Sequence, residues 1–275
     1  MAGLSAAARW AMRRGHGAAV ARAATLAYRL RDGPPRSFST DPSGRGINAQ
    51  PGAGFVSPTV HTAPLADIRA KTRDIFEYRY VPRPGDRVVD VGAGIGTETL
   101  VFSRQVGRAG RVVAIEAHPV TFRALAGTIA RSGLDNVLAV QAAVADREGE
   151  AFITHKEAHA GNAVTMEAGG IAVPARTLDA IVAEAGLSRI DYLKMNIEGA
   201  EALAIAGMER TVAMVRNIVV SCHDFIAERD GDEAMRTFAT VERYLRDRGF
   251  TLATRPDDPR PWVRYYLYGG REEGQ

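Results

Sequence analysis

The chain has 275 residues, 46% of them hydrophobic and 24% charged, which suits one α/β domain with an extension rather than two catalytic domains. No run of 18 apolar residues occurs, so no membrane-spanning helix is expected. The only cysteine, Cys222, excludes an internal disulfide and a cysteine-zinc site, and it favours a cytoplasmic location.

The formal net charge of +3 is unevenly distributed, because residues 1–31 contain six arginines and no acid. This segment predicts a basic, weakly amphipathic helix interrupted at Gly15 and Gly17. It could touch an anionic membrane surface, act as a targeting segment, or form an arm that covers another subunit. Residues 32–63 are rich in Ser, Thr, Gly and Pro and predict a linker.

From Pro64 onward, strand and helix patterns alternate, so residues 64–275 are expected to form the folded domain. The predicted strands are 87–91, 111–116, 137–142, 191–196, 217–221, 251–254 and 262–268. The predicted helices are 64–76, 98–105, 119–131, 178–185, 201–211 and 233–248. This order specifies an α/β fold with a mostly parallel sheet, helices on both faces and an antiparallel pair at the carboxyl end.

A glycine-rich loop follows the first strand of the alternating region. It contains Asp90, Gly92, Ala93, Gly94 and Gly96. Ligands of open α/β sheets bind at this carboxyl edge, and the next helix begins with free N–H groups that suit a carboxylate. The alternating glycines differ from the G-x-G-x-x-G pattern of dinucleotide sites and favour S-adenosyl-L-methionine. Asp90 is expected to orient the loop or to meet the ammonium group of the cofactor through water.

The next two strands end in further candidate cofactor residues. Glu116 follows the second strand, where its carboxylate can accept hydrogen bonds from both ribose hydroxyls, although a solvated acid is the structural alternative. Ala117 and His118 are expected beside the adenine. Ala142 and Ala143 can contact the adenine edge through their main chain.

One segment carries a much more specific pattern. Residues 190–201 read Ile-Asp-Tyr-Leu-Lys-Met-Asn-Ile-Glu-Gly-Ala-Glu, and Ala-Gly-Met follows at 206–208. This segment resembles the FkbM-type methyltransferase family, and the resemblance extends from about residue 88 to residue 220. It implies a Rossmann-like class I methyltransferase fold with a seven-stranded sheet. It also implies S-adenosyl-L-methionine as cofactor and a small-molecule hydroxyl acceptor such as a sugar or polyketide.

The chain departs from the family pattern at two positions. Asn196 replaces the usual aspartate, and Ser221 stands where the fifth strand usually carries a glutamate. Both changes remove hard oxygen charges, so we expect weak binding of Mg²⁺ and assign no metal ligands. Asn196 is retained as a candidate cofactor residue, with a helix cap as its structural alternative.

The catalytic candidates are Lys194, Glu198 and His223. Glu198 is expected at the carboxyl edge beside the glycine loop, and a structural ion pair with Lys194 is the alternative for both. His223 follows the fifth strand and is the expected general base for an alcohol, oriented by the adjacent Asp224. A strand-end histidine that only holds its loop is the alternative.

Residues 152–172 form a long glycine-containing segment that is expected to wall the acceptor pocket. We interpret His155 and His159 within it as solvated residues rather than a metal pair. Two rivals to a methyltransferase stay open at this point, namely a degenerate cofactor-binding subunit and an NAD-dependent oxidoreductase. No nucleic acid is expected as a partner, because the positive charge is concentrated in the amino-terminal segment.

Overall fold

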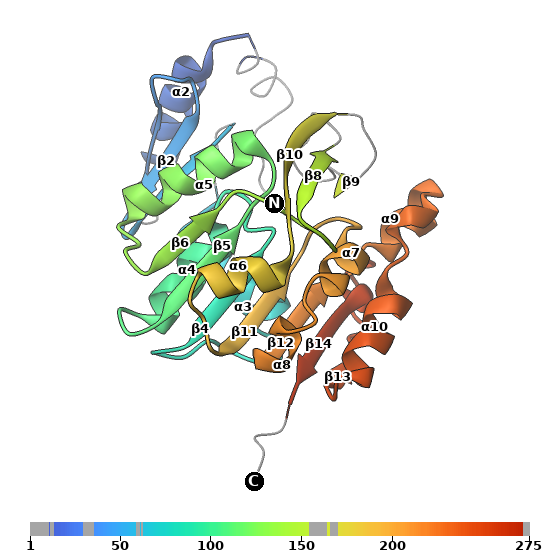
Figure 1. The fold of residues 1–275 in the computed structure, drawn as a ribbon. Coiled ribbons are helices and arrows are strands. Elements are labelled where there is room, and N and C mark those ends of the chain that lie inside the picture. Colours follow the sequence, from blue (N-terminus) through green and yellow to red (C-terminus); the bar gives the residue numbers. More distant parts are fainter. Residues whose placement is uncertain are drawn as a thin grey trace.

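The structure, a computed structural model, describes residues 11, 14–29, 36–58, 61, 63–153, 164–165 and 170–271. A central twisted sheet is flanked by helices, and two smaller sheets lie near one end of it (Figure 1). Among the residues described, no helix is both long and apolar enough to span a membrane.

Seven strands build the central sheet in the order β13-β14-β12-β11-β4-β5-β6. They are β4 (Arg87–Val91), β5 (Arg111–Ile115), β6 (Val137–Val140), β11 (Ile190–Met195), β12 (Val215–Ser221), β13 (Thr251–Ala253) and β14 (Tyr266–Gly270). The strands from β6 to β12 pair parallel, whereas β14 pairs antiparallel with β12 and β13. The predicted Rossmann-like fold with its antiparallel carboxyl-terminal strand is confirmed.

Helices cover both faces of this sheet. One face packs against α3 (Leu65–Ile75), α4 (Thr97–Val106) and α5 (Pro119–Ser132). The other packs against α6 (Leu178–Glu184), α7 (Glu201–Ala206), α8 (Thr211–Met214) and α10 (Phe238–Asp247). Because both faces are covered, successive residues such as Val88 and Val89 are fully buried, which explains the continuous apolar runs of the strands.

Several predicted boundaries are wrong in the carboxyl-terminal half. The helix expected over 201–211 is divided into α7 and α8, and the one expected over 233–248 begins as a short 3-10 helix, η1 (Glu233–Met235). The strand expected over 262–268 also begins as a 3-10 helix, η2 (Val263–Tyr265). A further helix, α9 (Asp224–Asp230), follows β12 and was not predicted.

The predicted linker is also corrected, because its described part forms a three-stranded antiparallel sheet. The strands are β1 (Ser37–Thr40), β2 (Gly46–Gln50) and β3 (Ala53–Ser57). The backbone N–H groups of Gly54 and Val56 donate to the hydroxyls of Ser132 and Thr128 on α5, both at 3.0 Å. These contacts, together with the burial of Phe55, attach the small sheet to the domain.

The amino-terminal segment contributes one described helix, α2 (Gly17–Arg29), which packs on β1. The hydroxyl of Thr25 accepts a hydrogen bond from the backbone N–H of Phe38 at 2.8 Å. Residues 1–10 lie outside the described part. A membrane surface or another subunit as partner of residues 1–31 stays a prediction.

The described parts of the segment expected as a pocket loop belong to a second small sheet, and residues 154–163 and 166–169 lie outside the described residues. This sheet contains β7 (Ala143–Val144), β8 (Gly149–Ile153), β9 (Val164–Thr165) and β10 (Ile171–Arg176), in the order β7-β10-β8-β9. Its strands lie at the upper end of the central sheet in Figure 1. His155 and His159 lie outside the described residues.

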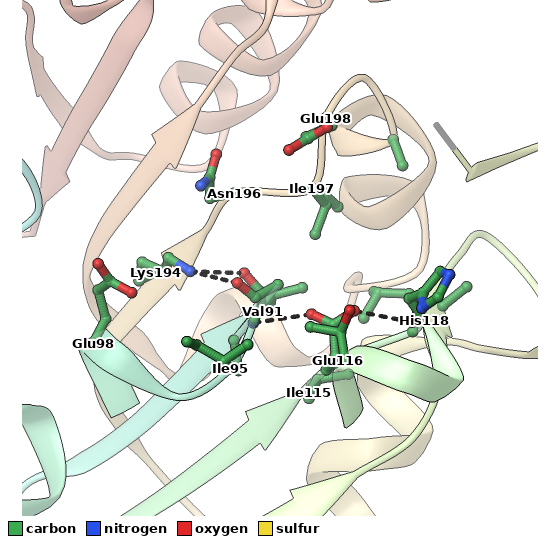
Figure 2. A pocket seen from close by; sticks show the side chains of 18 of the residues that line it. Val91, Ile95, Glu98, Ile115, Glu116, His118, Lys194, Asn196, Ile197 and Glu198 are labelled. Carbon is green, nitrogen blue, oxygen red and sulfur yellow. Dashed lines mark hydrogen bonds between the residues drawn. The ribbon is translucent and has the colours of Figure 1, made fainter. Parts of the chain in front are cut away.

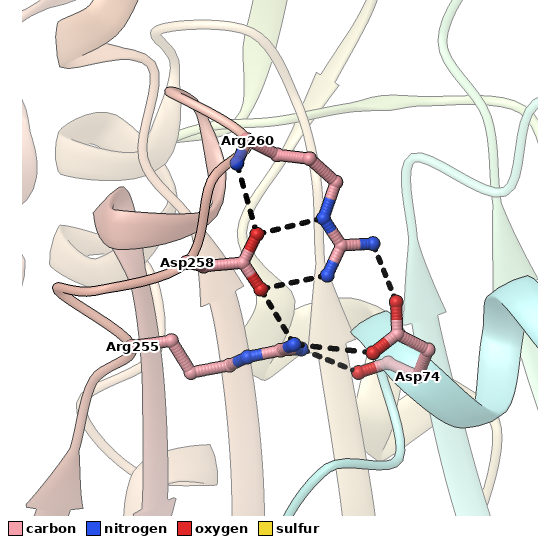
Figure 3. Close-up of polar contacts among 4 residues, drawn as sticks. All are labelled: Asp74, Arg255, Asp258 and Arg260. Atoms are coloured by element: carbon pink, nitrogen blue, oxygen red, sulfur yellow. Dashed lines mark hydrogen bonds and ion pairs between the residues drawn. The ribbon is translucent and has the colours of Figure 1, made fainter.

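The end of α3 is held by an ion-pair network with the turn before β14 (Figure 3). Arg260 makes two hydrogen bonds of 2.7 Å to the carboxylate of Asp258, and both Arg255 and Arg260 bind the carboxylate of Asp74. Planar arginine–carboxylate pairs of this kind fix orientation as well as distance. The network therefore positions α3 against the central sheet.

The attachment of the amino-terminal sheet can be tested at Thr128, which is fully buried. Replacing Thr128→Val keeps the shape of the side chain but leaves the N–H of Val56 without its acceptor. We expect the free energy of unfolding, measured in urea, to fall by about 1–3 kcal/mol. Ser132→Ala, at a partly exposed position where water can replace the hydroxyl, should cost less. Wild-type stability of Thr128→Val would contradict this attachment.

Candidate cofactor and active site

A cavity of about 340 Å³ lies at the carboxyl edge of β4, β5 and β11. Most of the predicted cofactor residues line it, namely Gly92, Ala93, Gly94, Glu116, Ala117, Ala142, Ala143 and Asn196. The candidate catalytic residues Lys194 and Glu198 line it as well. Asp90, Gly96 and His223 do not, and each has a different place in the structure.

The glycine loop is held against its two neighbouring strands. The N–H groups of Gly92 and Ala93 both donate to the carbonyl of Ile115 at 2.9 Å. Gly92 has a φ of 75°, and a Cβ atom there would lie 2.0 Å from the carbonyl oxygen of Asn196. Only glycine fits this position, because any side chain would push β4 and β11 apart at the cavity.

Beneath the loop, Asp90 and Lys194 form a buried ion pair, with 2.9 Å between Nζ and Oδ1. The two residues face each other directly in the register of β4 and β11. Lys194 also donates to the carbonyl of Gly92 at 2.8 Å, and Thr99 on α4 donates to Asp90 at 2.6 Å. Asp90 thus orients the loop. The ion pair that was the structural alternative for Lys194 and Glu198 is not formed, because Lys194 pairs with Asp90.

Glu116, which follows β5, accepts a hydrogen bond from the glycine loop. Its two carboxylate oxygens accept the backbone N–H groups of Gly94 and His118, both at 2.9 Å (Figure 2). Burial raises the pKa of Glu116 above its ordinary value, and these two N–H donors act in the opposite direction. A carboxylate oxygen has more than one lone pair, so Glu116 can still accept hydrogen bonds from a ligand.

The wall beyond Glu116 is made of small and neutral groups. Ala117, Ala142 and Ala143 leave room for a flat ring, and the last two are almost fully buried. His118 is buried at the start of α5, where its Nδ1 accepts the N–H of Val120 at 3.3 Å. This wall suits an adenine ring.

The opposite wall comes from the end of β11. Asn196 donates its backbone N–H to the carbonyl of Val91 at 3.1 Å, and Glu198 follows two residues later (Figure 2). Glu198 has a φ of 52° and is the only non-glycine residue with a positive φ among the described residues. Such a conformation costs about 1–3 kcal/mol and is concentrated at functional sites.

His223 lies at the end of β12, buried beside Glu201 at the start of α7. The distance between its Nδ1 and Oε1 of Glu201 is 2.8 Å. Glu201 is fully buried and also accepts the hydroxyl of Thr237 at 2.8 Å and the N–H of Gly199 at 3.1 Å. The imidazole is therefore fixed through one ring nitrogen.

The predicted partner of His223 was Asp224, and this assignment is wrong. The carboxylate of Asp224 accepts the N–H groups of Thr237 and Phe238 and so caps the start of α10. A carboxylate is stabilising at that position because the first N–H groups of a helix have no partner within it. Glu201 takes the role predicted for Asp224.

Other cavity residues were not predicted. Lys71 and Phe76 come from the α3 region, and Glu98 comes from the first turn of α4. Lys71 could have been noticed as one of only three lysines in the chain. Tyr265 and Tyr266 do not line the cavity. Tyr266 packs on Phe76 with ring centroids 6.0 Å apart.

The cavity fits S-adenosyl-L-methionine in size and in chemistry. Its volume lies at the lower end of the range for ligand sites, about 300–1,000 Å³. Gly94 has a φ of 57°, and a Cβ atom there would meet no protein atom, so the loop leaves space where a side chain would stand. The first turn of α4 begins at Thr97 on the cavity wall and offers N–H groups to a carboxylate.

No cluster of three or more His, Cys, Asp or Glu side chains that could hold a metal ion occurs among the described residues. The expectation of weak Mg²⁺ binding is not tested by this observation and stays a prediction.

The fold and the cavity together define the class of an S-adenosylmethionine-dependent methyltransferase. Residues 90–252, more than half of the chain, match the model of the family described as the methyltransferase FkbM domain. The chain belongs to this family, as the segment 190–201 predicted. Its cofactor is therefore S-adenosyl-L-methionine, and it is grouped with methyltransferases and not with NAD-dependent oxidoreductases.

Individual relatives match this chain over a short segment or at low sequence identity. The AMB antimetabolite synthetase AmbE of Pseudomonas aeruginosa is 40% identical over 83 residues, which are 30% of this chain and 4% of that protein. The methyltransferase FkbM of Methylobacillus flagellatus is 17% identical, with a TM-score of 0.46 over 73% of this chain and 50% of that one. Aeropyrum pernix fibrillarin, solved with bound S-adenosyl-L-methionine, is 13% identical, with a TM-score of 0.45 over 87% and 96%.

The raised pKa of Glu116 gives the site a defined pH dependence. A raised pKa means that this carboxylate gains its proton at a higher pH than an ordinary glutamate, and protonation removes an acceptor from the ribose hydroxyls. We therefore expect the Kd of S-adenosylhomocysteine, measured by calorimetry, to rise as pH falls from 8 to 5.

Glu116→Gln is the matched control. It should weaken binding by about 10–100-fold at pH 8, as expected for the loss of a charged hydrogen bond. Its affinity should change less with pH than that of the wild type. An equal pH dependence in the two proteins would contradict the role of Glu116.

Proposed function

We propose that this chain transfers a methyl group from S-adenosyl-L-methionine to a hydroxyl oxygen of a small metabolite. The sulfonium group of the bound cofactor supplies an electrophilic methyl carbon. The acceptor oxygen forms a bond to that carbon as the carbon–sulfur bond breaks, and the hydroxyl proton must pass to a base. The observation that carries the proposal is the buried pair of His223 and Glu201, because it provides such a base.

The geometry of the pair suits proton transfer. Glu201 holds Nδ1 of His223, which leaves Nε2 to accept the proton of the acceptor. Thr237 and Gly199 fix the carboxylate of Glu201 from two further directions. When His223 is protonated, the adjacent carboxylate balances the new positive charge, as in other histidine–carboxylate pairs.

The base is connected to the cofactor cavity through a short stretch of backbone. Glu198 lines the cavity, and the next residue, Gly199, donates its N–H to Glu201. We place the acceptor beside Glu198 and Asn196, between the cavity and His223. Within this proposal Lys194 is a positioning residue, since its ammonium group is engaged by Asp90 and the carbonyl of Gly92.

The family and one relative indicate the acceptor class. The resemblance to the FkbM-type family favours hydroxyls of sugars, polyketides and similar metabolites. The name of the AmbE relative, an antimetabolite synthetase, also points to small-molecule chemistry. We include no nucleic acid among the acceptors.

A catalytically degenerate cofactor-binding subunit is the second candidate. Asn196 lines the cavity in place of an acid, and Ser221 is buried at the end of β12. Two acids of the family pattern are thus absent. The two candidates share the cofactor site and differ in turnover.

The test of the base is His223→Ala. We expect methyl transfer from labelled S-adenosyl-L-methionine, measured on a panel of hydroxylated sugars, hydroxy acids and polyketide alcohols, to fall by at least about 100-fold. The Kd of S-adenosylhomocysteine should change less than twofold, because His223 does not line the cavity.

Glu201→Gln serves as the companion variant. It keeps a hydrogen-bonding group beside His223 but removes the negative charge, so turnover should fall and its pH profile should shift. Undiminished turnover in His223→Ala would exclude His223 as the base. Cofactor binding by the wild type without turnover on any acceptor would favour the degenerate subunit.

A further inference from the structure

One end of the cavity carries two opposite charges on different helices. Lys71 projects from α3 and Glu98 from the first turn of α4, and both line the cavity. The two helices pack on each other through Ile68 and Leu100. The charges of Lys71 and Glu98 also both act on the pKa of His61, in opposite directions. Glu98 lies on the side of Lys194, away from Glu116 and His118 (Figure 2).

Lys71 and Glu98 do not form an ion pair with each other. Within the part of the chain that the structure describes, Lys71 forms no ion pair within 4.0 Å, and the cavity's other ammonium group, on Lys194, is neutralised by Asp90. Lys71 is exposed at the cavity mouth, whereas Glu98 is partly buried. Lys71 and Glu98 face the same cavity without pairing with each other. They therefore suit a ligand that carries both a negative and a positive group.

We propose that Lys71 and Glu98 bind the amino-acid tail of the cofactor, Lys71 through the α-carboxylate and Glu98 through the α-ammonium group. The tail is a zwitterion, so its recognition needs a cation and an acid at one end of the site. Asp90, considered for the ammonium group from the sequence, is buried beneath the loop and engaged by Lys194 and Thr99.

The position of Glu116 supports this orientation. With Glu116 at the ribose and the small residues beyond it at the adenine, the tail points toward the first turn of α4. The N–H groups of that turn can share the carboxylate with Lys71, because a helix N-terminus attracts negative charge. Glu98 in the same turn accepts the hydroxyl of Thr97 through one carboxylate oxygen, and its other oxygen is placed for the neighbouring ammonium group.

His61 extends the same cluster toward the amino-terminal sheet. Its ring lies 5.6 Å from that of Phe55 on β3, between centroids. Burial lowers the pKa of His61, so the imidazole is neutral near pH 7 and does not cancel the charge of Glu98. Its Nδ1 is buried without a hydrogen-bond partner among the described residues. His61 itself does not line the cavity.

This proposal concerns cofactor binding and does not depend on the O-methyl transfer proposed above. Binding measurements therefore test it without any measurement of turnover. Calorimetry would compare S-adenosylhomocysteine, which has the amino-acid tail, with 5′-methylthioadenosine, which lacks it. Lys71→Met and Glu98→Gln should each weaken S-adenosylhomocysteine at least tenfold and change the affinity for 5′-methylthioadenosine less than twofold.

Two control variants sharpen the comparison. Arg69→Met removes a positive charge from the same helix away from the cavity and should leave both affinities unchanged. Glu116→Gln should weaken both ligands, since both carry the ribose.

Four results would overturn the proposal. One is wild-type affinity for S-adenosylhomocysteine in Lys71→Met and Glu98→Gln, and another is an equal loss for the two ligands. A raised KM for the acceptor with unchanged S-adenosylhomocysteine affinity would assign Lys71 to the acceptor instead. A wild-type protein that binds neither ligand would overturn the cofactor assignment as well.

Discussion

The buried ion pair between Asp90 and Lys194 joins the two middle strands of the sheet at the point where the cavity begins. Both side chains are nearly inaccessible to solvent, so each charge depends on the other and on its hydrogen bonds. Thr99 supplies one such bond to Asp90, and the carbonyl of Gly92 accepts one from Lys194. The pair therefore fixes the glycine loop and the first turn of α4 together.

Three carboxylates at the carboxyl edge of the sheet, those of Asp90, Glu116 and Glu201, have different roles because they have different partners. Asp90 is neutralised by Lys194 and shapes the loop, whereas Glu116 is held by two backbone N–H groups and faces the cavity. Glu201 is buried with His223. The same residue type thus serves the framework, the ligand and the proposed base, according to what surrounds each carboxylate.

Much of the central fold could be predicted from the sequence. Strand β4 has the predicted bounds, because strands covered on both faces are continuous apolar runs with polar ends. The sheet formed by β1, β2 and β3 was missed, because its sequence is rich in glycine and serine. Its stability comes from tertiary contacts, such as that of Val56 with Thr128 on α5, which no local pattern shows.

The site was predictable where residues adjacent in sequence act together, and less so where distant residues meet. The glycine loop and Glu116 were found in this way. The partner of His223 was assigned to its neighbour Asp224, although Glu201 reaches it from another element. The pairing of Lys194 with Asp90 depends on the register of β11 on β4, which the pattern alone does not fix.

The Asp90–Lys194 pair holds the loop in the form that binds the cofactor. This can be tested by measuring the Kd of S-adenosylhomocysteine for the variant Asp90→Asn. The substitution keeps the shape of the side chain and leaves Lys194 without its ion-pair partner. Residue 90 does not line the cavity, so the variant removes no direct contact with the ligand. We predict that affinity falls at least about tenfold, a loss of about 1.4 kcal/mol or more, in a variant that still unfolds cooperatively. Wild-type affinity in a folded Asp90→Asn protein would contradict this account.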